Sequence, residues 1–257
     1  MNKAVPRTLR GSPLGSPETV AETARSVRGM FDAVAPRYDF LNHFLSLGFD
    51  LAWRRAAAQE LRGALHRPES VALDLCCGTG DLAFALAKVS KGRVLGADFS
   101  QPMLQRAVAK NSRGHRAVFF LEGDCLSLPF ADGCADAVTT AFGFRNLASY
   151  ALGLREMRRV LKPEGVVAIL EFSTVEWPLF GPVFRAYFAG VLPWIGNSIS
   201  GVRGAYQYLH DSVKHFPNQE ELAALMREER FEGVRYRNFM GGVAALHLGV
   251  KPGSQSP

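Results

Sequence analysis

Short runs of apolar residues alternate along this chain with stretches in which apolar residues recur every three or four positions. The runs predict strands at 71–76, 93–97, 117–122, 135–141 and 166–172, and the periodic stretches predict helices at 81–89, 100–111 and 149–161, the last of them closed by a turn at 162–165. A helix is also expected at 219–229, followed by two strands at 233–238 and 243–250. This alternation indicates an α/β fold with a seven-stranded, mainly parallel sheet, helices on both faces and a carboxyl-terminal antiparallel hairpin.

Three segments lie outside this alternation. Residues 1–17 are rich in Pro, Gly, Ser and Arg and contain no acid, which predicts a disordered leader, with a transit peptide left open. Residues 18–65 are expected to form amino-terminal helices, one of them capped by Asp50. An apolar insertion is expected at 175–209; between 178 and 201 its only charge is Arg185, but Pro182 and Pro193 argue against a membrane-spanning helix.

Length and composition favour a single compact domain over residues 18–257, large enough to hold a full hydrophobic core. The chain has 257 residues, 47% of them hydrophobic, and its four cysteines contain no CxxC pair. We therefore expect neither a disulfide scaffold nor a metal site, and a reducing, cytoplasmic location. Of the net charge of +6, residues 1–29 contribute +3, and the remaining +3 (6 minus 3) is mild. Since no Lys or Arg run follows, we expect no nucleic-acid partner.

A glycine turn carries the clearest chemical motif. Gly78-x-Gly80-x-x-Ala83 follows a predicted strand and opens a predicted helix, and Asp98 ends the next strand 20 residues after Gly78. This is the pattern of a nucleoside-cofactor site, in which glycines allow a tight turn and the acid accepts hydrogen bonds from the ribose. Taken alone, the pattern fits NAD or FAD as well as other nucleosides.

The charges around the turn favour a cationic cofactor. Asp81 stands at the helix start and Asp74 lies four residues before Gly78, so the two carboxylates would repel a pyrophosphate. S-adenosylmethionine instead carries an α-ammonium and a sulfonium. Asp124 follows the third strand, where it can accept the adenine amino group while the backbone N–H of Cys125 reaches a ring nitrogen. Ordinary helix capping by Asp81 and a plain surface turn at Asp124 are the alternatives.

Several motifs along the chain point to one family. They include YDxxN at 38–42, LDxCxGTGD at 73–81, ADFSxxML at 97–104, LPF at 128–130, FGxRN at 142–146 and the REMxRVLKP stretch at 155–163. From about residue 26 to 251 the chain resembles the class I, Rossmann-like S-adenosylmethionine methyltransferases of ubiquinone and menaquinone biosynthesis, the UbiE/MenG family. The resemblance implies carbon methylation of a prenylated quinol: demethylmenaquinol to menaquinol or, alternatively, a methoxy-polyprenyl-benzoquinol of ubiquinone synthesis.

The resemblance also implies the site residues. Those expected to hold the cofactor are Asp74, Gly78, Thr79, Gly80, Asp98, Phe99, Asp124, Cys125 and Ala141. Ala141 stands where the family often has a serine, which puts a hydroxyl on the cofactor side in doubt, and Arg203 lies in a stretch usually richer in acids. Arg145, Asn146 and Tyr38 are the expected catalytic residues. Because an arginine stays protonated, we expect Arg145 to stabilise a developing phenolate rather than to act as a base. Tyr38 contacts the quinol or, equally, packs against the sheet.

The apolar insertion predicts a mouth for the prenyl tail. Its large apolar residues include Trp177, Phe180, Phe184, Phe188 and Trp194, and they favour peripheral contact with a membrane. Plain core packing or a homodimer interface are the alternatives. Three other functions fit the sequence less well than methylation of a quinol. A NAD-dependent oxidoreductase does not explain Asp124 or FGxRN, a non-catalytic cofactor-binding module has no need of Arg145-Asn146, and an RNA methyltransferase lacks a basic surface.

Overall fold

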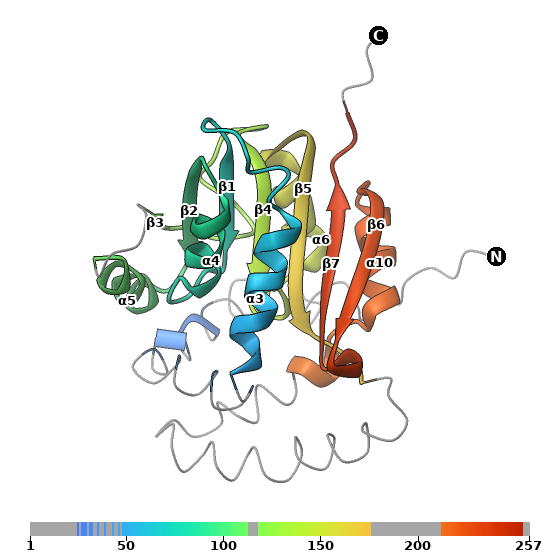
Figure 1. Cartoon of the computed structure of the whole chain (residues 1–257). Helices are drawn as coiled ribbons and strands as arrows, with labels where there is room; N and C mark the ends of the chain where they lie inside the picture. The colour runs from blue at the N-terminus through green and yellow to red at the C-terminus, as the bar shows by residue number, and fades with distance from the viewer. Residues whose placement is uncertain are drawn as a thin grey trace, which may run out of the picture.

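The computed structural model describes residues 25, 27–29, 31–32, 35, 39, 43, 46, 48–112, 118–175 and 212–253. Its centre is a seven-stranded sheet in the order β3-β2-β1-β4-β5-β7-β6 (Figure 1). The strands are β1 (Val71–Leu75), β2 (Arg93–Asp98), β3 (Val118–Glu122), β4 (Ala135–Ala141), β5 (Leu161–Phe172), β6 (Glu232–Phe239) and β7 (Ala244–Val250). The first five pair in parallel, whereas β7 runs antiparallel to both β5 and β6. The predicted fold class, including the terminal hairpin, is confirmed.

Helices cover both faces of this sheet because successive strand residues point to opposite sides. In β5, Val167 and Ile169 join the core beneath α6 (Tyr150–Val160) and α10 (Gln219–Glu228), whereas Ala168 and Leu170 join the core beneath α3 (Phe49–Glu60) and α4 (Asp81–Val89). Figure 1 shows α3 and α4 in front of the sheet and α6 and α10 behind it. Helix α5 (Gln101–Asn111) lies beside β2 and β3. The fully buried strands explain the apolar runs of the sequence.

At the starts of α6 and α10, side chains satisfy free backbone N–H groups. Ser149 caps α6 by accepting from the amide of Leu152, and Asn218 forms a reciprocal capping box with Glu221 at the start of α10. The expected cap at Asp50 is wrong. Gly48, in the left-handed conformation, precedes α3, and the Asp50 side chain lies inside the first turn, where it bonds to Ser46 and Arg54.

One strand is longer than its sequence predicted. The structure begins β5 at Leu161, five residues before the expected start, and the predicted turn at 162–165 becomes an irregularity within the strand. Glu164 has a φ of 64°, and its amide donates to the carbonyl of Lys251 next to β7. The segment that follows β7 therefore accepts the hydrogen bond that a residue of an isolated turn would make to another residue of the same turn.

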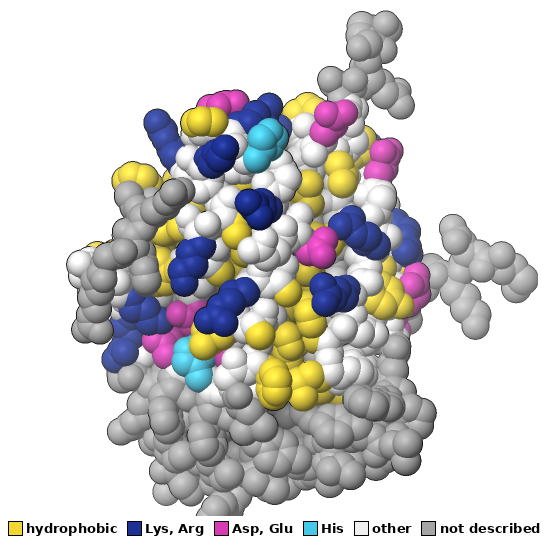
Figure 2. Space-filling model, viewed as in Figure 1, with side chains coloured by type: hydrophobic (Ala, Val, Ile, Leu, Met, Phe, Trp, Pro, Cys, Tyr) yellow, Lys and Arg dark blue, Asp and Glu magenta, His cyan; other side chains and the backbone are white. Residues whose placement is uncertain are grey.

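The surface seen from the α3 side mixes basic and apolar groups. Figure 2 shows Lys and Arg side chains spread over this face and hydrophobic side chains gathered low on it. Phe49 and Met240 are 44% and 37% exposed. Within the described residues, no helix is both long enough and apolar enough to cross a membrane. The expected leader, Tyr38 and almost all of the apolar insertion lie outside the described residues, so the membrane contact and the homodimer stay predictions.

Candidate active site

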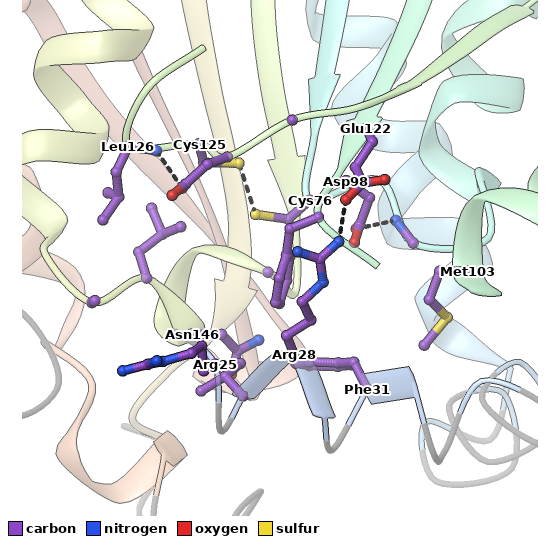
Figure 3. Close-up of a pocket in the computed structure, with 18 of the residues that line it drawn as sticks. Arg25, Arg28, Phe31, Cys76, Asp98, Met103, Glu122, Cys125, Leu126 and Asn146 are labelled. Atoms are coloured by element: carbon purple, nitrogen blue, oxygen red, sulfur yellow. Dashed lines mark hydrogen bonds and ion pairs between the residues drawn. The ribbon is translucent and has the colours of Figure 1, made fainter. Parts of the chain in front are cut away.

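A cavity of about 520 Å³ opens at the carboxyl ends of the parallel strands (Figure 3). Cys76 and Gly78, just after β1, line it together with Phe142 and Gly143, just after β4. The chain continues from β1 toward one edge of the sheet and from β4 toward the other, so the order of strands reverses between them. Such a switch point leaves a crevice in which α/β proteins bind ligands.

The glycine turn is built from backbone conformations that favour glycine. Gly78 and Gly80 have φ values of 55° and 88°, and Cys76 has a φ of 50°. A Cβ atom added to Gly80 would lie 2.9 Å from the ring of Phe120, so the helix start packs directly on an aromatic side chain of β3. A left-handed residue other than glycine, as at Cys76, is a local strain of a kind that clusters at functional sites.

Asp98 organises the turn from the end of β2. One of its carboxylate oxygens accepts a hydrogen bond from the amide of Gly78 (2.8 Å), and the other accepts from the amide of Ser100 (2.9 Å). The carboxylate lines the cavity and keeps further lone pairs for hydroxyl groups of a ribose. Burial raises the pKa of Asp98 to about 6, and the backbone hydrogen bonds partly offset that rise.

The turn after β3 supplies the next wall. Asp124 and Cys125 line the cavity, and a carboxylate oxygen of Asp124 accepts from the amide of Leu126 (2.8 Å), which fixes the acid in the turn. Glu122, paired with Asp98 in the β2–β3 register, faces the same space and forms an ion pair with Arg28. The predicted adenine wall therefore lies next to the predicted ribose acid.

Asp74 lies in a separate, smaller cavity on the other side of Cys76, which Thr79, Asp81 and Ala141 also line. Asp74 is buried at 1% exposure, and its Oδ1 accepts from Thr139 (3.1 Å). Its Oδ2 has no hydrogen-bond partner in the described part of the chain. Burial raises the pKa of this carboxyl to about 7, mitigated first by the Thr139 hydrogen bond. An unsatisfied buried carboxylate beside the glycine turn fits a cationic cofactor such as S-adenosylmethionine.

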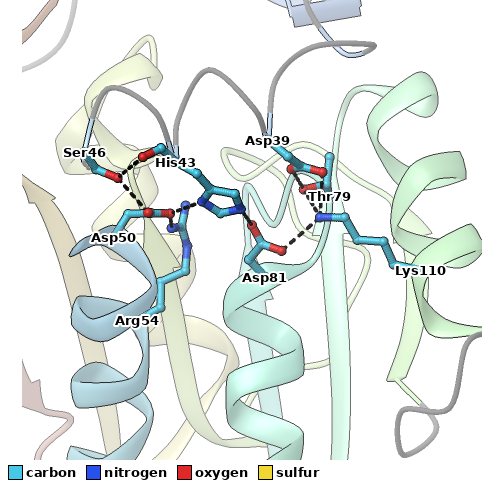
Figure 4. A network of polar contacts seen from close by, with 8 residues as sticks. All are labelled: Asp39, His43, Ser46, Asp50, Arg54, Thr79, Asp81 and Lys110. Atoms are coloured by element: carbon cyan, nitrogen blue, oxygen red, sulfur yellow. Dashed lines mark hydrogen bonds and ion pairs between the residues drawn. The ribbon is translucent and has the colours of Figure 1, made fainter. Parts of the chain in front are cut away.

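The second acid of the turn is already neutralised. Asp81 accepts from the ammonium of Lys110 (2.9 Å), and the same ammonium lies 2.8 Å from Asp39 and 2.9 Å from Thr79 (Figure 4). The Nε2 atom of His43 is 3.8 Å from the Asp81 carboxylate. The charge argument made from the sequence therefore rests on Asp74 rather than on Asp81. Thr79 also turns toward Lys110 and is not among the described residues that line the larger cavity.

The predicted catalytic residues separate in space. Asn146 lines the large cavity, whereas the guanidinium of Arg145 is buried behind it and bonds to Glu171 at 2.7 Å. Glu171 also accepts from the backbone amide of Arg145 (3.2 Å), and the guanidinium lies 5.5 Å from the ring centroid of Phe172. The sequence alone did not indicate this ion pair, because Glu171 reads as an interior residue of β5.

The cavity is also lined by side chains that the predicted site did not include, among them Arg25, Arg28, Phe31 and Met103. Phe31 meets Phe99 edge to face, with ring centroids 6.3 Å apart, and so connects the amino-terminal segment to a predicted cofactor residue. Met103 belongs to the ADFSxxML motif, which was a usable indication of its place. The two arginines have no motif of their own, and only the three-dimensional fold brings them to the cavity.

Together the sheet order, the glycine turn and the acids at the carboxyl ends of β1, β2 and β3 define a class I methyltransferase that uses S-adenosylmethionine. A model of the ubiE/COQ5 methyltransferase family matches residues 18–251, and the chain belongs to that family. The comparisons give the NAD-dependent oxidoreductase no support.

Two named relatives are similar to this chain in sequence along nearly its whole length. A demethylmenaquinone methyltransferase of Thermus thermophilus is 50% identical over 224 residues, covering 87% of this chain and 100% of that protein. A ubiquinone/menaquinone biosynthesis C-methyltransferase UbiE of Geotalea uraniireducens is 41% identical over 236 residues, covering 90% of this chain and 99% of that protein.

Solved structures share the fold. A methyltransferase of Thermotoga maritima, described as a possible histamine N-methyltransferase, superimposes with a TM-score of 0.62 at 19% identity, covering 88% of this chain and 99% of that one. Phosphoethanolamine N-methyltransferase 2 of Haemonchus contortus, solved with S-adenosylmethionine, gives a TM-score of 0.55 at 16% identity, covering 83% of this chain and 59% of that one. At such identities these structures show the fold alone.

Proposed function

We propose that this protein methylates a ring carbon of a prenylated quinol, converting demethylmenaquinol to menaquinol. The observation that carries the proposal is the 50% identity, over the full length of the relative, to a protein named demethylmenaquinone methyltransferase. The 41% identity to a protein named for both quinone pathways keeps a methoxy-polyprenyl-benzoquinol as the second candidate.

The cofactor is assigned to residues on both sides of Cys76. Asp98 accepts from the ribose hydroxyls, and Phe99, Asp124 and the Cys125 amide hold the adenine. Asp74 faces the cationic end, since its Oδ2 is buried and unsatisfied among the described residues. Gly78 and Gly80 let the backbone approach closely. Thr79 and Ala141 line the smaller cavity and contribute to the binding of the cationic end of the cofactor indirectly, by shaping the wall of that cavity.

When bound, S-adenosylmethionine supplies a methyl group on a cationic sulfur, which an electron-rich ring carbon takes by direct displacement. The protein's contribution is to position the quinol and to stabilise the negative charge that builds on its oxygen. Asn146 is placed for this because it lines the cavity beside Phe142 and Gly143. Its side-chain amide donates to the quinol oxygen and orients the ring.

Arg145 acts from behind this wall. Its guanidinium is held between Glu171, the carbonyl of Phe142 and the ring of Phe172, so it fixes the FGxRN backbone and places a positive charge near the cavity. Because the guanidinium stays protonated and Glu171 engages it, proton removal from the quinol is assigned to another group or to water. Tyr38 stays a prediction for contact with the quinol.

An aromatic row leads away from the cavity and supports an apolar substrate. The ring centroid of Phe142, which lines the cavity, lies 4.6 Å from that of Phe172 and 6.2 Å from that of Trp53. Trp53 in turn stacks on Phe49 (6.3 Å), whose side chain is 44% exposed. Phe142 and Trp53 are packed in the core at 4% exposure each, so the row is a continuous apolar layer that reaches from the cavity to the exposed Phe49, where a prenyl tail can find an apolar surface.

The ring preference is tested by methyl transfer to short-chain demethylmenaquinol and to its benzoquinol analogue, each kept reduced under anaerobic conditions. We expect kcat/KM for the naphthoquinol to exceed that for the benzoquinol by at least about tenfold, as a pocket shaped for the larger ring would give. Equal or reversed values would move the assignment to the ubiquinone branch. Absence of transfer to both would contradict quinol methylation itself.

A further inference from the structure

Two thiols meet inside the cofactor cavity. Cys76 follows β1, Cys125 lies in the turn after β3, and their Sγ atoms are 3.2 Å apart (Figure 3). Both side chains line the cavity, and Cys125 is only 4% exposed. A disulfide bond is roughly 2.05 Å long, so a movement of about 1.2 Å would join them. Methylation as proposed above uses the Cys125 backbone and has no role for either sulfur.

The surroundings hold the Cys76 thiol in place. A Cβ atom added to Gly143 would lie 2.4 Å from the Cys76 Cβ and 3.3 Å from its sulfur, so the FGxRN turn closes that side. The left-handed backbone of Cys76, with a φ of 50°, fixes the direction of its side chain. Closing the gap therefore requires movement of the more peripheral element, the turn that carries Asp124 and Cys125.

We propose that Cys76 and Cys125 form a reversible disulfide that weakens cofactor binding, which makes the pair an oxidation site within the cofactor cavity. The reaction needs a small peroxide as its oxidant. The thiolate of one cysteine attacks a peroxide oxygen, the O–O bond breaks, and a sulfenic acid and water form. The second sulfur then attacks the sulfenic sulfur, the S–S bond forms and a second water leaves. Two thiols and one hydrogen peroxide thus give one disulfide and two waters.

Cofactor affinity falls because the disulfide displaces the adenine wall. The Cys125 amide and the Asp124 carboxylate belong to the turn that must move toward Cys76, while Asp98 stays fixed to Gly78 and Ser100. Loss of about one hydrogen bond in a desolvated site corresponds to roughly a tenfold change in affinity. A bound cofactor in turn excludes peroxide from the cavity and protects the two thiols. This consequence rests on the adenine placement proposed above, whereas formation of the disulfide does not.

The Cys76 sulfur is held as a thiol at neutral pH. The hydrogen bond from Cys125, together with burial and the nearby Asp98 and Cys77, raises the pKa of Cys76 well above its ordinary range. Since only the thiolate attacks peroxide, attack by the Cys76 sulfur is slow at pH 7 and accelerates about tenfold per pH unit below that pKa.

The test uses the full chain, reduced or treated with hydrogen peroxide, with and without S-adenosylmethionine. Peptide mass spectrometry locates the disulfide, and isothermal titration gives the cofactor Kd of the reduced and oxidised protein. The variants are Cys76→Ser and Cys125→Ser, with Cys134→Ser as the matched control that keeps the pair.

We expect a Cys76–Cys125 linked peptide in the wild type and in Cys134→Ser, and an increase in Kd of at least about tenfold that thiol reductant reverses. Within each of the other two variants the Kd should not change on oxidation, whatever its starting value. Bound cofactor should suppress the linked peptide. A peptide linked through Cys77 or Cys134 instead, or no linked peptide, would overturn the oxidation site. A linked peptide with unchanged affinity would overturn its effect on the cofactor.

Discussion

Asp74 and Asp98 are buried carboxylates at the ends of adjacent parallel strands, and burial raises the pKa of both, to about 7 and about 6. Each keeps an acceptor for a bound molecule, and Asp74 has an unsatisfied oxygen among the described residues. Such groups oppose folding when they are charged and unpaired. In the cofactor placement proposed above, the cationic end of the cofactor relieves this cost for Asp74, so binding would correct a locally unfavourable arrangement.

The pH dependence of the unfolding free energy of the Asp74→Asn variant, compared with the wild type, should reveal this cost. The folded pKa of about 7 lies above the ordinary 3.8, so between these values the folded protein holds a proton that the unfolded chain has released. Stability without cofactor therefore falls as pH rises through that window. At pH 8 we expect Asp74→Asn to be more stable than the wild type by about 2–4 kcal/mol in urea unfolding, with a much smaller difference at pH 4.

The same variant should bind S-adenosylmethionine more weakly, by titration calorimetry, even while its fold is more stable. The control is Asp132→Asn, whose side chain is 80% exposed in a surface ion pair with Arg159 and should change neither property measurably. Equal stability of Asp74→Asn and wild type at pH 8 would refute an unpaired charge at this position.

A test of Arg145 requires variants that separate its contribution to the stability of the fold from its contribution to turnover. Arg145→Met alone leaves the 1%-exposed Glu171 without its ion-pair partner and should cost about 3–5 kcal/mol in unfolding free energy. The double variant Arg145→Met/Glu171→Gln removes the stranded charge and keeps one acceptor oxygen, for one of the two backbone amides, of Arg145 and of Phe172, that donate to different oxygens of Glu171.

We expect the double variant to regain most of that stability and to keep its cofactor affinity, while turnover stays low by roughly 100-fold. The single variant Glu171→Gln serves as its control for turnover. Recovery of turnover along with stability would show that Arg145 only supports the fold.

Secondary-structure elements place these side chains, and the turn between β1 and α4 is the most constrained of them. Gly80 combines a φ of 88° with close contact to Phe120, so a side chain there faces both strain and collision. Gly63, just after α3, has open space where a Cβ would lie and no left-handed φ, which makes it a matched control.

We therefore expect Gly80→Ala to lower the unfolding free energy by about 1–3 kcal/mol and to weaken cofactor binding, whereas Gly63→Ala should be neutral within about 0.5 kcal/mol. Thermal unfolding and calorimetric titration measure the two effects. Normal cofactor affinity in Gly80→Ala would mean that the turn tolerates displacement and does not form the cofactor wall.

The elements that sequence patterns predicted correctly are those with strong local causes. The buried runs of β1, β2 and β4 and the helices α6 and α10, which Ser149 and Asn218 cap, depend on nearby residues, and the structure has these elements close to their predicted bounds. The Asp50 cap was wrong because Gly48 begins the helix and the Asp50 carboxylate binds Ser46 and Arg54, each four residues away. The 162–165 turn was wrong because Lys251, which is distant in sequence, accepts the hydrogen bond of the Glu164 amide. The Lys110 contact with Asp81 is likewise set by the packing of α5 near α4, which no local pattern contains.

The molecule as a whole explains why the predicted site was only partly assembled. A parallel sheet brings all its strand ends to one edge, so residues after β1, β2, β3 and β4 were predictable as neighbours. The sequence did not predict that Cys76 divides this edge into two cavities. One cavity holds Asp74, Thr79 and Ala141, and the other holds Asp98, Asp124 and Asn146. Side-chain packing between strands decides this division, and alternation of polar and apolar positions does not encode it.

Transfer of a heavy-isotope methyl group from S-adenosylmethionine to short-chain demethylmenaquinol tests the central claim most directly. The reaction is run with the purified chain, once with the substrate reduced and once with it oxidised to the quinone. The account predicts a labelled carbon–methyl product from the quinol only, because the oxidised ring is not nucleophilic. Label on an oxygen or nitrogen atom, equal reaction of the quinone, or no transfer to the quinol by a protein that binds the cofactor would contradict it.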